Sequence, residues 1–203
     1  MDKQEAVMTA LRKSMDAVKK VEPILCNMLE EAMDDGSKFK LYAVEGDDNE
    51  ICKKLDLTCG IDYMLEWIRD GKSTMYGVGC RVQWVDLPKE KLWNTFTIRI
   101  HRDSGAETEF EKRVRAINSK AIYPTLTLHI YMNKNTGNVE SFAIAKTEEI
   151  TKYILTQTQG IEHKHTGSNQ IGQASFIAVD WKLFEPYAKR LYVYERSSYG
   201  NLF

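Results

Sequence analysis

The sequence lacks the segments that mark membrane, secreted and zinc-binding proteins. Its longest apolar runs fall far short of the about 20 residues that a membrane-spanning helix needs. Residues 1–20 carry charge throughout, without the continuous apolar segment of a secretory signal. The four cysteines are scattered and form no C-x-x-C pair, so closely spaced zinc ligands are missing. We therefore expect a cytoplasmic protein with free thiols and without a membrane partner.

The sequence also lacks an excess of charge of one sign. The net charge is −1 over 203 residues, so the overall balance points neither to nucleic acid nor to an anionic membrane. A polyanion would need a local basic patch. There is no serine nucleophile elbow, and Gly77 and Gly79 lack the third glycine and the following helix of a dinucleotide-binding motif. Function must therefore be sought in less specific patterns.

Length and hydrophobic periodicity predict one domain over 1–203 with an α/β or α+β fold. Apolar residues at three- and four-residue steps predict an N-terminal helical segment over 1–34, which Pro23 should kink or split. Interleaved strand and helix patterns over 38–195 predict a central mixed β-sheet with flanking helices, and 196–203 should form a frayed tail.

Three predicted strands, over 59–67, 76–84 and 94–102, alternate apolar and polar residues. If they pair as a meander, their polar faces align on one surface. That surface would carry Asp62, Glu66, Arg81, Gln83, Arg99 and His101. A sheet face in water shows the same alternation, so a solvated face is the alternative. Against it stands the composition, because such faces are usually rich in Lys, Thr, Glu and Ser.

A helix is predicted after the third strand. Ser104 followed by Glu107 matches a capping box at its start. Its apolar residues define the buried direction: Phe110, Val114 and Ile117. A helical wheel then places Glu109 and Arg113 together on one flank and points Lys112 to solvent.

This order of elements resembles the PD-(D/E)XK nuclease superfamily, which has the restriction-endonuclease-like fold. The resemblance rests on DLTCGID over 56–62, on the strand GVGCRVQW over 77–84, and on the helix and strand as far as Tyr131. It implies a metal-dependent phosphodiesterase that cleaves DNA, with Asp62 as a ligand of Mg²⁺ or Mn²⁺. It also implies a second acid and, two residues later, a lysine on the next strand.

Those residue types suit the chemistry, because carboxylates are hard oxygen ligands for Mg²⁺ and the metal activates a bound water. The sequence departs from the family pattern here, since Arg81 and Gln83 occupy the acid-x-lysine positions. Arginine cannot ligate a cation, and glutamine is at best a neutral oxygen donor. Either the site has migrated or the domain binds without cutting.

In a migrated site the second metal ligand would be Glu109, on the following helix, or Glu66, and Gln83 would orient a water or the metal. The alternative for Glu109 is an ordinary i,i+4 pair with Arg113 on an exposed helix.

Arginines crowd into the same unit. Because arginine binds phosphate bidentately, we expect Arg81, Arg99 and Arg113 to grip phosphate. Ordinary surface charge is the alternative.

The resulting hypothesis is a nuclease-like protein that binds nucleic acid, DNA rather than RNA, and that could cleave it with Mg²⁺ or Mn²⁺. One rival is a catalytically degenerate binding protein with the same fold. The other is a phage or mobile-element protein-interaction module that forms a homodimer through the N-terminal helix.

Overall fold

The computed structural model describes residues 3–44, 49–87, 89–102, 105–157 and 174–196. In chain order its helices are α1 (Lys3–Met33), α2 (Glu50–Lys54), the π-helix η1 (Leu55–Cys59), α3 (Glu109–Ser119), α4 (Thr147–Gln157), α5 (Trp181–Phe184) and the 3₁₀ turn η2 (Glu185–Tyr187). The strands are β1 (Lys38–Ala43), β2 (Tyr63–Arg69), β3 (Lys72–Val85), β4 (Thr95–Arg102), β5 (Leu126–Asn133), β6 (Val139–Lys146), β7 (Ala174–Asp180) and β8 (Leu191–Glu195). Within the described residues no helix is long and apolar enough to cross a membrane.

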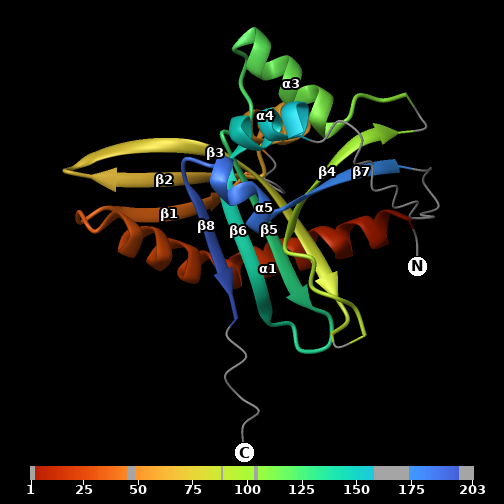
Figure 1. Cartoon of the computed structure of the whole chain (residues 1–203), viewed down its shortest axis with the longest axis horizontal. Helices are drawn as coiled ribbons and strands as arrows, with labels where there is room; N and C mark the ends of the chain where they lie inside the picture. Colours follow the sequence, from red (N-terminus) through yellow and green to blue (C-terminus); the bar gives the residue numbers. More distant parts are fainter. Residues whose placement is uncertain (1–2, 45–48, 88, 103–104, 158–173, 197–203) are drawn as a thin grey trace, which may run out of the picture.

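Six strands form one mixed sheet in the order β1-β2-β3-β5-β6-β8 (Figure 1). Neighbours are antiparallel except β3 and β5, which run parallel and are joined through β4 and α3. A parallel pair needs such a crossover, because the chain must return to the same end of the sheet before the second strand begins, which a tight turn cannot do. The predicted mixed sheet with flanking helices in an α+β domain is confirmed.

The predicted three-strand meander is wrong. β2 and β3 do form the expected hairpin, but β4 leaves the sheet and pairs antiparallel with β7. Side chains of β5 hold β4 over the sheet face: the Thr97 amide donates to Nδ1 of His129 at 3.1 Å, and the Thr95 amide donates to the Tyr131 hydroxyl at 3.2 Å. These bonds replace a backbone ladder, so β4 becomes part of a second layer.

α1 packs on the opposite face of the sheet. Val21 and Leu25 are both 0 % exposed, and they lie on either side of Pro23. The helix runs as one element through this proline, so of the two outcomes expected at Pro23, a kink or a split, the split does not occur. Proline inside a helix costs about 3 kcal/mol. Burial of the two neighbouring side chains contributes a similar amount, about 1.5–3 kcal/mol each, and keeps the helix intact.

α3 begins later than expected. Its capping box is formed by Thr108 and Glu111, whereas Ser104 lies outside the described residues. Its most buried side chains are Arg113 and Ala116, while the three apolar residues that were to define the buried face are only half-buried. The helix is therefore rotated from the orientation predicted by apolar spacing, and it turns charged side chains toward the sheet.

Candidate functional site

Asp62 joins three strands at the start of β2. It follows Gly60, which ends η1 at φ +70, a conformation that glycine adopts without strain. The Asp62 amide donates to the Val78 carbonyl at 2.9 Å, and its carbonyl accepts from the Val44 amide at 2.9 Å. Its carboxylate accepts a short hydrogen bond from the Cys80 amide. The backbone thus fixes the Asp62 carboxylate against the middle of β3.

Charged side chains from β3 and α3 meet Asp62 around a cavity of about 200 Å³. Its charged lining comprises Asp62, Arg81, Glu109, Lys112 and Arg113. Gly60, Gly79 and Pro124 contribute apolar or backbone surface. The structure therefore brings together four residues singled out from the sequence. It adds Lys112, whose Nζ lies 3.4 Å from the Leu57 carbonyl rather than pointing away into solvent.

Gly79 makes the close approach of α3 possible. A Cβ at this position would lie 3.2 Å from Nη2 of Arg113 and 3.3 Å from the Gly60 carbonyl. Both distances are tighter than ordinary van der Waals contact. The absent side chain therefore leaves room for the guanidinium group beneath the helix.

Glu109 is held by two arginines. Its Oε1 lies 2.6 Å from Nη2 of Arg113, and its Oε2 lies 3.0 Å from Nη2 of Arg81. The Arg113 side chain is only 5 % exposed. Burial raises the pKa of Glu109, but Arg113 and Arg81 outweigh burial and the pKa lies below its usual range. The predicted i,i+4 pair thus exists, but it is largely buried and shared with a strand.

A second group of arginines adjoins this cavity. The guanidinium carbons of Arg81 and Arg99 each lie 5.3 Å from the ring centre of Phe176 on β7. Burial lowers the pKa of Arg99, and Arg81 and Arg102 lower it further, against the attraction of Glu109. Positive charge is therefore concentrated here beyond what Glu109 neutralises, which favours an anion.

His129 lies beneath the arginines and was not singled out from the sequence. It is the register partner of Arg81, is 1 % exposed, and stacks on Tyr131 with ring centres 5.0 Å apart. Burial, and then Arg81, hold the pKa of His129 well below 6.5, so the ring is neutral at physiological pH. The sequence signal for His129 was the alternation over 126–132, because it puts Thr127, His129 and Tyr131 on one face of the strand.

Glu66, Gln83 and His101 do not join the cavity. The carboxylate of Glu66 accepts hydrogen bonds from Tyr42 at 2.7 Å and Ser73 at 2.6 Å, farther along the hairpin. Gln83 lines a separate cavity of about 720 Å³ beneath β4 and β7. His101 is exposed on β4. The predicted surface is therefore divided: Glu66 and Gln83 lie at other places along the β2–β3 hairpin, and β4 has carried His101 out of the sheet.

The donor set does not fit Mg²⁺ or Mn²⁺ as it is arranged. In the described part of the chain, no three His, Cys, Asp or Glu side chains are grouped so that they could hold a metal ion. Each oxygen of Glu109 already faces a guanidinium group, whereas Mg²⁺ demands near-octahedral oxygen ligands. We assign no reaction step to a metal.

No family model, curated protein or solved structure matches this chain. The resemblance to the PD-(D/E)XK superfamily stays a prediction.

Proposed function

We propose that the chain binds the phosphate backbone of nucleic acid through the cavity between β3 and α3. The observation that carries this proposal is the clamping of Glu109 by Arg81 and Arg113 beside Lys112 and Asp62. Three cations face two carboxylates in this cavity, and Arg99 and Arg102 add further positive charge nearby.

Glu109 acts here as an orienting group. A guanidinium group has five N–H donors in a fixed plane, and a carboxylate on one side leaves the remaining donors for a phosphate. Arg113, whose side chain is only 5 % exposed, holds Glu109 from below. Arg81, at 30 % exposure, can present its remaining donors to an incoming phosphate oxygen.

The topology supports a restriction-endonuclease-like fold for this binding protein. The order on which the resemblance rests corresponds to α1, β1, the β2–β3 hairpin, α3 and β5, with Asp62 at the start of β2. Arg81 and Gln83 stand where the family has an acid and a lysine. Binding without cleavage is therefore the version that the geometry favours.

Metal-dependent cleavage is the second candidate, because Asp62, Glu109 and Lys112 line the same cavity. It would require Glu109 to release at least one guanidinium group.

The test is binding of labelled double-stranded DNA, and of RNA with the same sequence, at increasing salt with either EDTA or Mg²⁺ present. We expect affinity to fall steeply with salt and to be unaffected by EDTA. Arg81→Gln should weaken binding about tenfold, because a charge-assisted phosphate contact is lost. The matched control is Arg196→Gln, which removes the same charge outside the cavity.

Two results would change the assignment. Cutting in Mg²⁺ that Asp62→Ala abolishes would establish the second candidate. Absence of salt-sensitive binding to either polymer would contradict both and leave the protein-interaction module.

A homodimer through α1 is part of that module hypothesis. The described side chains near the start of α1 are exposed, with Met8 at 45 %, and burial begins at Ala17. Sedimentation at increasing protein concentration, compared with Met8→Lys, tests whether a second copy covers this segment.

A further inference from the structure

The central sheet divides where β3 and β5 part. β3 pairs with β5 only from Val78 onward, whereas 72–77 pair with β2 alone. Beyond this point β1, β2 and the start of β3 form one wing, and β6 and β8 form the other (Figure 1). A cavity of about 130 Å³, here called the wing cavity, lies between them beside Leu29 and Met33 of α1.

One wall of the wing cavity is a row of aromatic rings. The ring centres of Phe39 and Trp67 are 6.4 Å apart, and those of Trp67 and Tyr76 are 6.5 Å apart, both stacked. The indole N–H of Trp67 donates to Oγ of Ser37 at 2.7 Å, which fixes the orientation of the ring. This wall therefore presents a rigid apolar surface suited to another ring.

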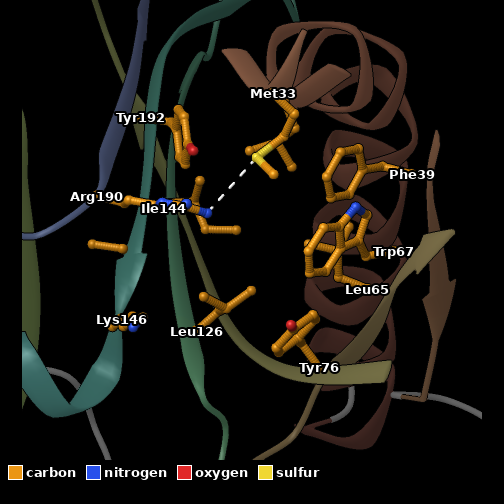
Figure 2. A pocket seen from close by; sticks show the side chains of 12 residues that line it. Met33, Phe39, Leu65, Trp67, Tyr76, Leu126, Ile144, Lys146, Arg190 and Tyr192 are labelled. Atoms are coloured by element: carbon orange, nitrogen blue, oxygen red, sulfur yellow. Dashed lines mark hydrogen bonds between the residues drawn. The ribbon is translucent and has the colours of Figure 1, made fainter. Parts of the chain in front are cut away.

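The opposite wall combines apolar side chains with two cations. Figure 2 shows Tyr192, Ile144 and Leu126 facing the aromatic row, and Arg190 reaching across toward Met33. Nη1 of Arg190 lies 3.7 Å from Sδ of Met33, and a thioether is only a weak acceptor.

Arg190 and Lys146 are the two cations of this wall. Among the described residues, no carboxylate forms a salt bridge with Arg190 or Lys146. The pKa of Glu148 is lowered first by its hydrogen bond with Lys152 and also by Lys146, but Glu148 pairs with Lys152 at 2.7 Å. An aromatic wall thus faces two cations that form no salt bridge within the described part of the chain.

We propose that the wing cavity binds a small carboxylic acid with one aromatic ring. The ring would lie against Phe39, Trp67 and Tyr76, and the carboxylate would accept from Arg190 and Lys146. The wing cavity, at about 130 Å³, is slightly smaller than the about 150 Å³ of apolar space that holds one benzene ring. It can therefore take no more than one ring, and the part of the ligand that carries the carboxylate would lie at the mouth of the cavity. Arginine can also meet a carboxylate with two parallel hydrogen bonds. This proposal is independent of nucleic-acid binding.

The experiment uses the whole chain and 3-phenylpropionate, with 3-phenylpropionamide as the neutral counterpart. Tryptophan fluorescence and isothermal titration calorimetry report binding. We expect saturable binding of the acid, about tenfold tighter than the amide, since only the acid has a charge-assisted bond. Trp67→Phe should remove the fluorescence response while calorimetric binding persists.

Arg190→Gln should reduce the preference for the acid over the amide severalfold, because Lys146 still faces the carboxylate. Lys182→Gln, an exposed lysine on α5 outside the wing cavity, is the matched control and should keep the preference. If Arg190→Gln does not fold by circular dichroism, Lys146→Gln provides the test and should reduce the preference severalfold.

Equal binding of acid and amide to the natural chain would overturn the proposal, and so would the absence of saturable binding. An acid preference that survives both Arg190→Gln and Lys146→Gln would overturn it as well. Arg81→Gln should leave binding of the acid unchanged. A failure of the wing-cavity proposal can therefore be distinguished from a failure of the proposed phosphate site.

Discussion

The two faces of the central sheet bury different kinds of side chain. Under α1, β5 presents Leu128, Ile130 and Met132, each 0 % exposed. Toward β4 and α3 the same strand presents His129 at 1 % and Tyr131 at 0 % exposure, and both take part in hydrogen bonds. The first face is held by apolar contact alone, whereas the second also depends on specific hydrogen bonds and ion pairs. A buried polar face favours one arrangement of its side chains, but removal of one hydrogen-bonding group leaves its partner unsatisfied and lowers stability.

The largest expected effect is on the α1 face. Leu25→Ala should lower the free energy of unfolding by about 2–5 kcal/mol, because the fully buried side chain leaves a cavity. Denaturant unfolding measures the change. Leu155→Ala, at a position 50 % exposed, should cost less than about 1 kcal/mol. Similar costs at both positions would contradict the proposed core.

On the polar face, Arg113→Ala should cost about 3 kcal/mol, because it removes one partner from a largely buried ion pair. The control lies on the same helix: Arg115→Ala breaks an exposed pair with Glu107 and should cost less than about 1 kcal/mol. Equal effects in denaturant unfolding would show that Arg113 makes only a surface contact.

His129 should make stability depend on pH. Its pKa in the folded chain lies well below 6.5, first through burial and then through Arg81. Below about pH 6.5 the unfolded chain takes up a proton that the folded ring does not, so stability falls by about 1.4 kcal/mol per pH unit. Above about pH 6.5 the ring is neutral in both the folded and the unfolded chain, so His129 then causes no loss of stability. Unfolding at about pH 7 and about pH 5.5 measures the slope, and His129→Gln should show a smaller one. If His129→Gln leaves the slope unchanged, the pH dependence of stability arises from other groups.

The smallest effect distinguishes two glycines of β3. Gly79→Ala should cost about 1–2 kcal/mol and weaken nucleic-acid binding, because its Cβ would lie 3.2 Å from Nη2 of Arg113. Gly77→Ala places a Cβ 2.9 Å from Cδ1 of Ile61, so it should cost stability without a direct effect on the phosphate site. Thermal unfolding and DNA-binding assays separate the two. Equal loss of affinity would show that only overall stability matters.

Much of the fold could be predicted from local patterns. Alternation located β2, β3 and β4, and apolar spacing located α1. The candidate site was predictable in part, since Asp62, Arg81, Glu109 and Arg113 share one cavity. The place of Lys112 could not be predicted, because a wheel built on apolar residues alone ignored the polar surface beneath α3.

The sequence by itself determined where most strands and helices form, because apolar residues recur with a period of 2 in strands and 3.6 in helices, and both periods can be read from positions close together in the chain. Only the tertiary structure decided where β4 goes and how α3 is rotated. His129 and Tyr131 supply hydrogen-bond partners that hold β4 above the sheet, and Gly79 leaves the space that Arg113 occupies. These contacts join residues far apart in the chain, and their free energy depends on geometry that no local pattern contains.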